Sequence, residues 1–234
     1  MLNNNKNLKE KSMSFQVYLI RHGQTLLNKY KRFQGWCDTP LTDKGIKDAR
    51  MAGKHLQNIK FDAAYHSDSG RAIRTCKIIL AENKFPTPKS ISLTNFREQG
   101  FGYFEGDDSG HIWTMIGLPY GTQNYQGLVK KLGFPAARDL IHKADPFGDA
   151  EDSATMWKRI TNGFDYLRKH HHDGQKILLV SHCITICTII NHIAPEINAP
   201  LNFPKNGSVT KLSFHNNGKI TVDYFNHYHD DDNY

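Results

Sequence analysis

The chain has 234 residues and a hydrophobic fraction of 38%, which suits one α/β domain with a core that needs no disulfides. Its formal net charge of +7 comes from scattered lysines and arginines with no dense basic run, which favours a small phosphorylated molecule over nucleic acid as partner. The apolar runs are too short to span a bilayer, and the polar N-terminus lacks a signal-peptide pattern, so we expect a cytoplasmic protein without membrane segments.

The first third of the chain alternates predicted strands and helices. Residues 1–13 are rich in Asn and Lys and predict a disordered segment. The apolar run 15–20 predicts a buried strand that ends at Arg21-His22-Gly23, with a helix starting after Gly23. Thr42 is a suitable N-cap for a helix over 43–57, whose apolar residues form one stripe. Further along, the pattern predicts a strand over 61–65, a helix over 69–82 and a strand over 90–93.

The rest of the chain contains an irregular segment followed by regular elements. Residues 100–149 hold many glycines and aromatics without a clean period, and they predict an insertion with short helices that forms a lid over the active site. We expect the domain to run from 14 to 229, with a loose acidic tail after it. The later elements are a helix from about 149 to 170, a strand over 177–180, a helix over 184–193, and a hairpin of 209–214 and 219–225 around Asn216-Asn217-Gly218.

This alternation predicts a mostly parallel central sheet flanked by helices on both faces, closed by an antiparallel hairpin. Ligands of such folds bind where loops leave the carboxyl ends of the strands. Polar groups follow three of the predicted strands at such places: Arg21-His22-Gly23, the segment 66–68 that leads to Arg71, and Ser181-His182. The sequence therefore predicts one anion site at this edge of the sheet.

These residue types suit a phosphoryl group. Arginine can grip phosphate with a bidentate fork, glycine allows close backbone approach, and the amide end of a following helix favours negative charge. A neutral imidazole is a competent nucleophile, so His22 could attack phosphorus while Arg21, Arg71 and His182 stabilise the equatorial oxygens. By itself, Arg-His-Gly is a weak signal, and a loop arginine beside a core histidine is the simpler interpretation.

The leaving alkoxide needs a proton, and Glu98 follows the predicted strand over 90–93. A carboxyl group beside phosphate is more easily protonated, which suits a general acid, and the same carboxylate could later activate water. Without further context Glu98 would be a surface loop acid. The four cysteines include Cys183 and Cys187 on one predicted helix, and we interpret them as packed thiols in preference to a metal pair.

The segment Leu19-Ile20-Arg21-His22-Gly23-Gln24-Thr25 resembles the signature of the histidine phosphatase superfamily, which includes the cofactor-dependent phosphoglycerate mutases. Further blocks resemble the family in the same order along the chain and span most of it. They are Asn28, the stretch Arg32 to Thr42 with Gly45, Ser67 to Thr75, Arg97-Glu98 with Gly102 and Glu105-Gly106, and Ser181-His182.

The resemblance implies a three-layer, phosphoglycerate mutase-like α/β sandwich, with His22 as the phosphorylated nucleophile and Glu98 as the proton donor. It implies no metal and no further cofactor. The implied phosphate and substrate contacts are Arg21, Gly23, Asn28, Gln34, Gly35, Arg71 and His182. One departure stands at residue 183, where the family usually has glycine and this chain has Cys183.

Three functions compete on this pattern. The favoured one is a phosphatase that hydrolyses small phosphomonoesters through a phosphohistidine. The second is a phosphoglycerate mutase, which needs extra cations after the acid block, where residues 99–150 offer Lys130, Lys131, Arg138 and Lys143 but no adjacent arginine pair. The third is an inactive binding module, which the full set of pocket residues disfavours. We expect a phosphorylated small molecule as partner, and a monomer or homodimer.

Overall fold

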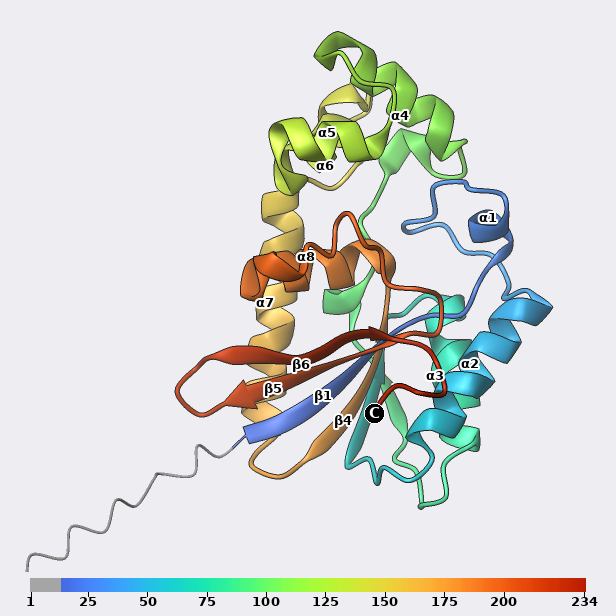
Figure 1. The fold of residues 1–234 in the computed structure, drawn as a ribbon, viewed down its shortest axis with the longest axis vertical. Coiled ribbons are helices and arrows are strands. Elements are labelled where there is room, and N and C mark those ends of the chain that lie inside the picture. Colours follow the sequence, from blue (N-terminus) through green and yellow to red (C-terminus); the bar gives the residue numbers. More distant parts are fainter. Residues whose placement is uncertain (1–13) are drawn as a thin grey trace, which may run out of the picture.

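One mixed sheet forms the centre of the molecule in the computed structural model, which describes residues 14–234. Within these residues, six strands pair in the order β3-β2-β4-β1-β5-β6 (Figure 1). The strands are β1 (Ser14–Arg21), β2 (Ala63–His66), β3 (Ser90–Ser92), β4 (Lys176–Ser181), β5 (Val209–His215) and β6 (Ile220–His227). The segment 1–13, predicted to be disordered, lies outside the described residues.

The first four strands are parallel, and the last two form the predicted antiparallel hairpin. β1 pairs in parallel with β4, β4 with β2, and β2 with β3. β5 runs antiparallel to β1 on its other side and continues into β6. The parallel strands share a direction, so their carboxyl ends and the polar residues that follow them meet at one edge.

The sheet is buried on both faces because alternate residues of its inner strands serve two separate apolar clusters. Val17 and Leu19 of β1 pack into the cluster of one face, and Tyr18 and Ile20 pack into the cluster of the other. This is the period of two that a strand requires when both of its faces are covered. It explains why the run 15–20 is apolar at nearly every position.

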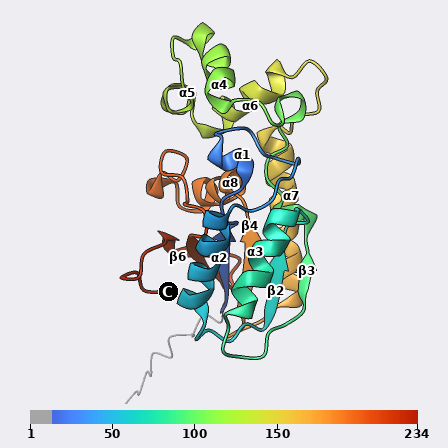
Figure 2. The same ribbon diagram turned by 90° about the vertical axis from the view of Figure 1, so that its right-hand side faces the viewer.

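Helices cover the two faces and give the predicted three-layer arrangement (Figures 1 and 2). α2 and α3 lie on one face, and α7 and α8 lie on the other. The helices are α1 (Leu26–Lys29), α2 (Asp43–Leu56), α3 (Gly70–Ala81), α4 (Ser109–Gly117), α5 (Tyr125–Leu132), α6 (Phe134–Ala144), α7 (Ser153–His170) and α8 (Cys183–Ile193). No helix within 14–234 is both long and apolar enough to cross a membrane.

The segment that the sequence marks as an insertion folds into α4, α5 and α6 at one end of the molecule, above the loop that carries α1 (Figure 1). Backbone contacts join this lid to that loop. The Phe33 amide donates to the Asp107 carbonyl at 2.9 Å, and Arg32 and Asp108 form an isolated β-bridge. The lid is therefore tied to the segment that follows the His22 loop.

Two expectations need correction. The helix predicted after Gly23 is a single turn, α1, whose Asn28 amide is capped by the Thr25 hydroxyl, so it offers no helical dipole to an anion. The C-terminal tail is ordered: the Tyr228 hydroxyl donates to Asp48 at 3.1 Å, and the Tyr234 ring stacks on His55 with centroids 4.3 Å apart. Aromatic anchors among the acidic residues fix the tail on α2.

Gly45 in the first turn of α2 lets the loop after β1 pack against the helix. A Cβ at Gly45 would lie far inside van der Waals contact of the Gln24 carbonyl oxygen. Helix propensity alone would make Gly45→Ala stabilising by about 1 kcal/mol. We expect the opposite sign, a loss of roughly 1–3 kcal/mol in the free energy of unfolding by urea, because backbone must shift.

The matched control is Gly110→Ala on the exposed start of α4. A Cβ there would meet only the end of the Asp108 side chain. This variant should be neutral or slightly more stable. Equal effects of the two substitutions would contradict the packing argument.

Candidate active site

His22 follows β1 and is buried, with 3% of its surface exposed. Its Nδ1 lies 2.8 Å from the carbonyl oxygen of Gly23. A carbonyl can only accept, so Nδ1 must carry the ring proton and Nε2 must carry the lone pair. The local backbone thus selects the tautomer that leaves Nε2 as the nucleophilic atom.

The charge state of His22 also favours nucleophilicity. Burial lowers the pKa of His22 well below its usual value of 6.5, and the positive charges of Arg71 and Arg21 lower it further. The ring is therefore neutral at pH 7. A neutral imidazole retains the lone pair that attack on phosphorus requires.

Arg71, near the start of α3, is fully buried beside His22, and all five of its N–H groups have acceptors. The acceptors are His22 Nε2 (3.3 Å), the carbonyls of Gln34 (3.5 Å), Gly35 (2.7 Å) and Cys37 (2.9 Å), and Asp38 Oδ1 (2.8 Å). The longest two, to the His22 ring and to Gln34, are the weakest. An incoming phosphate oxygen can replace them at the least cost.

His182 caps the N-terminus of α8 directly after β4 and is fully buried. Its ring centroid lies 5.0 Å from that of His22, and its Nε2 is hydrogen-bonded to Ser67 Oγ at 2.6 Å. Burial, with Arg71 and His22 nearby, lowers the pKa of His182 well below 6.5. Its Nδ1 is buried and has no hydrogen-bond partner in residues 14–234.

Arg21 contributes a second buried polar atom without a partner. Its Nη1 donates to the Pro204 carbonyl at 2.7 Å, which fixes the side chain, but its buried Nε has no acceptor within the described part of the chain. Buried polar groups in native proteins are almost always satisfied. Unsatisfied nitrogens on Arg21 and His182, near two further basic side chains, indicate a site for an anion.

Asn28 and Glu98 lie around this anion site. Asn28 lines the neighbouring pocket, and its Oδ1 accepts from Asn206 Nδ2 at 3.2 Å. The carboxylate of Glu98 accepts from the backbone amides of Ile184 (3.0 Å) and Thr185 (3.1 Å) in the first turn of α8. The helix that begins at His182 therefore also positions the predicted general acid.

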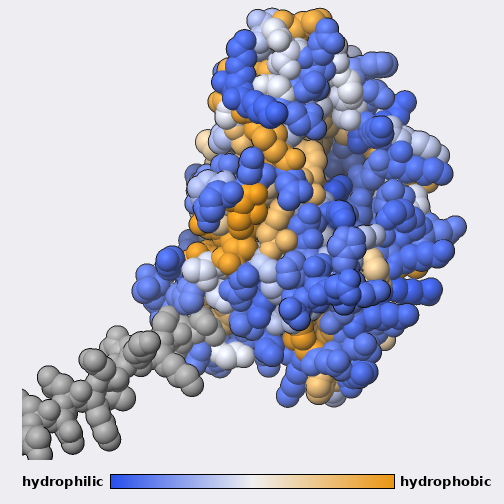
Figure 3. Space-filling view, viewed as in Figure 1, coloured by the Kyte–Doolittle hydropathy of each residue, from blue (hydrophilic) through white to orange (hydrophobic). Residues whose placement is uncertain are grey.

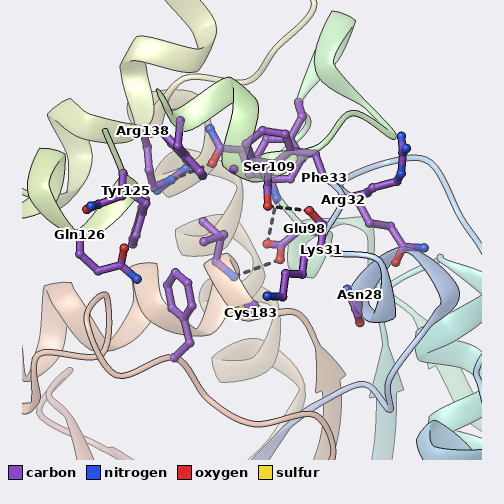
Figure 4. A pocket seen from close by; sticks show the side chains of 18 of the residues that line it. Asn28, Lys31, Arg32, Phe33, Glu98, Ser109, Tyr125, Gln126, Arg138 and Cys183 are labelled. Carbon is purple, nitrogen blue, oxygen red and sulfur yellow. Dashed lines mark hydrogen bonds between the residues drawn. The ribbon is translucent and has the colours of Figure 1, made fainter. Parts of the chain in front are cut away.

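A pocket of about 450 Å³ opens beside Glu98, between the lid and the body (Figure 4). Figure 3 shows the molecule hollowed between these two parts, with apolar residues gathered along one side. Cys183, at the position where the resemblance implies glycine, lines this pocket and also packs against the core. A hydrogen bond with Cys187 lowers the pKa of the Cys183 thiol against the opposing effect of burial.

Three residues that were expected to contact the substrate make hydrogen bonds to other protein groups. The Gly23 amide donates to Thr75 Oγ1 at 3.1 Å, so it is not available to a phosphate. Gln34 lines the pocket, but its side-chain amide is bonded to the hydroxyls of Thr25 and Thr39. Gly35 presents its carbonyl to Arg71. These residues shape the site and orient Arg71.

Two residues that support the site, Glu105 and Asn206, were not predicted from the sequence as part of it. Glu105 accepts from the amides of Gly35, Trp36 and Cys37 at 2.8–3.3 Å, and so fixes the loop whose carbonyls bind Arg71. Asn206 donates to the His22 carbonyl at 2.9 Å. Glu105 lies in a block that resembles the family, which was a usable signal, whereas Asn206 lies in a loop without a distinctive pattern.

The family model of the histidine phosphatase superfamily (branch 1) matches residues 17–227, which is nearly all of the chain that the structure describes. The chain belongs to the histidine phosphatase superfamily. Enzymes of this superfamily transfer phosphoryl groups, and the six-stranded sheet and flanking helices found within 14–234 agree with its fold. The expected family and fold are thereby confirmed.

Relatives include both mutases and phosphatases. A crystal structure of phosphoglycerate mutase from Bacillus anthracis is 34% identical, with a TM-score of 0.83, over 92% of this chain and 94% of that one. A 2,3-bisphosphoglycerate-dependent phosphoglycerate mutase of Methanococcus vannielii is 31% identical over 61% of this chain and 57% of its own length. Fructose-2,6-bisphosphatase TIGAR B of Danio rerio is 37% identical over 44% of this chain and 41% of its own.

The two buried histidines predict an acid-sensitive fold. Their pKa values lie below 6.5 in the folded chain and near 6.5 in the unfolded chain, so below about pH 6.5 the unfolded state binds more protons. Their contribution to stability is complete above that pH and is lost as the pH falls. Each such ring lowers the free energy of unfolding by about 1.4 kcal/mol per pH unit below pH 6.5, so we expect a fall of about 2–3 kcal/mol between pH 7.5 and 5.5 from the two rings together.

A variant with His22→Gln and His182→Gln should show a distinctly flatter pH dependence in the same titration. The exposed His172 serves as the control, and His172→Gln should leave the dependence unchanged. Parallel curves for the double variant and the unmodified protein would contradict the assignment of neutral, buried rings.

Proposed function

We propose that this chain is a phosphatase that hydrolyses small phosphomonoesters through a phosphohistidine on His22. The observation that carries the proposal is the neutral ring of His22, with its lone pair on Nε2 beside Arg71. One buried nitrogen each of Arg21 and His182 adds to it, because neither has a partner within residues 14–234. Such a hollow suits a phosphate dianion, because the dianion balances the charge and supplies the acceptors.

In the first step, Nε2 of His22 attacks phosphorus and the P–O bond to the alcohol breaks. Under this proposal, Arg21, Arg71 and His182 stabilise charge on the equatorial oxygens. Repulsion by the dianion favours protonation of Glu98, which then gives its proton to the leaving alkoxide. In the second step, the Glu98 carboxylate takes a proton from water, the water oxygen bonds to phosphorus, and the P–N bond breaks to release phosphate.

Among the residues after the acid block, the cations favour hydrolysis over mutase activity. Lys31 and Arg32, which come before that block, line the pocket, but they come from one side of it only. A mutase must retain a second anionic group of its substrate after the first transfer, which requires cations on the pocket wall. Lys130, Lys131 and Lys143 are exposed and do not line the pocket. Arg138 does line it, but its buried guanidinium donates to Gln99 (2.8 Å) and Thr188 (3.0 Å).

Phosphoglycerate mutase is the second candidate, because the structure of 34% identity bears that name and covers nearly the whole chain. The inactive binding module finds least support, since His22, Arg71 and His182 are all present and His22 contacts the other two. We further propose a cytoplasmic location, as a monomer or homodimer, with a phosphorylated small molecule as the partner.

A substrate panel tests the proposal. It comprises an aryl phosphate, sugar phosphates and 3-phosphoglycerate, each assayed for phosphate release with a chelator present. We expect phosphate release to continue in the presence of the chelator, because every proposed step uses protein side chains and none uses a metal ion. In His22→Ala, release should fall by about 10³-fold or more. Steady isomerisation of 3-phosphoglycerate with little phosphate release would overturn the phosphatase in favour of the mutase.

Glu98→Gln tests the proton donor. The first step should slow by about 10²–10⁴-fold for an alkyl phosphate, whose alkoxide leaves poorly, and far less for 4-nitrophenyl phosphate, whose phenolate leaves without help. Release of the alcohol in a single turnover isolates this step from hydrolysis of the phosphohistidine. Equal losses on both substrates would show that Glu98 is not the acid.

A further inference from the structure

The pocket beside the phosphate site has one wall of aromatic side chains that pack against one another at tilted angles. Tyr125 at the start of α5 packs between Trp113 and Phe203, with ring centroids 5.1 and 5.2 Å away. All three residues line the pocket. A wall of this kind suits a planar or apolar group, because aromatic faces bind rings through stacking and surface burial.

The hydroxyl of Tyr125 is a buried polar group that lacks a partner. Tyr125 is only 6% exposed, and its oxygen makes no hydrogen bond within residues 14–234. Burial raises the pKa of Tyr125, so the group stays a neutral donor at any physiological pH. A hydroxyl in this position is costly to the fold unless an acceptor enters the pocket.

Lys31 supplies a cation from another part of the pocket lining. Its side chain extends into the pocket, whereas Tyr125 approaches from α5 (Figure 4). The Lys31 ammonium has no ion pair or hydrogen bond to the residues that the structure describes, while the neighbouring Arg32 donates to the Gly106 carbonyl. Lys31 adopts φ 56° because it ends α1 in the usual left-handed conformation. Its amide donates to the Asn28 carbonyl (3.1 Å), and the Arg32 amide donates to the Leu27 carbonyl (2.9 Å).

The Lys31 backbone is fixed to the lid. Its carbonyl accepts from both the amide (3.0 Å) and the hydroxyl (2.7 Å) of Ser109. The position from which the ammonium enters is thus set by two hydrogen bonds to the first residue of α4. The Lys31 side chain itself is exposed, so it offers a single solvated ammonium at the pocket. A single charge matches a carboxylate, whereas a second phosphate dianion would call for several cations, like those around His22.

We propose that this pocket is a leaving-group subsite, in which Lys31 and Tyr125 select phosphomonoesters of ring-bearing alcohols that carry a carboxylate. The ring lies against Trp113, Tyr125 and Phe203, Lys31 pairs with the carboxylate, and the Tyr125 hydroxyl donates to a polar group of the same molecule. The proposal rests on the phosphatase function and adds the substrate class and two specificity-determining residues.

The test compares 4-carboxyphenyl phosphate with its neutral counterpart of similar shape, 4-carbamoylphenyl phosphate. The quantities measured are kcat/KM for each substrate and the Kd of each product alcohol, 4-hydroxybenzoate and 4-hydroxybenzamide. The variants are Lys31→Met, Lys31→Arg, Tyr125→Phe and the control Lys29→Met. Lys29 is an exposed cation two residues earlier that does not line the pocket.

We expect the unmodified enzyme to prefer the carboxylate by about 10-fold or more in kcat/KM, the usual range for a hydrogen-bonded charge. Lys31→Met should abolish the preference, Lys31→Arg should retain most of it, and Lys29→Met should leave it unchanged. Tyr125→Phe should lower kcat/KM for both substrates several-fold and keep or raise Tm, because it removes an unsatisfied hydroxyl without removing the ring.

If kcat/KM showed no preference for the carboxylate substrate, or if the preference persisted in Lys31→Met, the proposed subsite would be wrong. Lack of turnover with both substrates would count against the phosphatase, and the Kd values of the two alcohols would still decide the subsite. Tighter binding of 4-hydroxybenzoate that depends on Lys31 supports it. Equal Kd values, or a Tyr125→Phe variant that loses stability without any kinetic change, would reject it.

Discussion

The buried guanidinium of Arg71 is the interaction on which the site depends. It joins three segments that are distant in the chain: the loop after β1 through His22, the loop 34–38 through carbonyls and Asp38, and its own helix α3. A cation removed from water must find such partners, or its desolvation would unfold the region. Glu105 completes the arrangement by binding the amides of the same loop whose carbonyls face Arg71.

The same arrangement explains how the site can be both stable and reactive. Strong acceptors fix Arg71, while its bond to the His22 ring is long and easily exchanged for a phosphate oxygen. Burial and neighbouring positive charge keep His22 and His182 neutral, which costs stability at acid pH but preserves the lone pair that the proposed attack by His22 requires. Within residues 14–234, one nitrogen of Arg21 and one of His182 have no partner, and under the proposed function a bound phosphate dianion supplies acceptors for them.

Much of this was predictable from sequence, for identifiable reasons. The apolar run 15–20 and the Ile177–Val180 run predict doubly covered strands, and parallel strands must bring His22 and His182 to one edge. Backbone hydrogen bonds were not predictable. The residue types do not show that the Gly23 carbonyl selects the tautomer of His22 or that the Gly35 carbonyl accepts from Arg71. They also do not show that Lys31 has a left-handed backbone conformation beside the pocket. Those features depend on tertiary placement of the main chain.

The most direct test of the account is the position of the phosphoryl group on the imidazole. The enzyme would be quenched in alkali during turnover of a phosphomonoester, digested, and examined by ³¹P NMR or mass spectrometry for the two isomers of phosphohistidine. Because Nδ1 donates its proton to the Gly23 carbonyl, the account predicts an acid-labile phosphoryl group on Nε2 of His22. A label on Nδ1, on another residue, or on no residue during active turnover would contradict it.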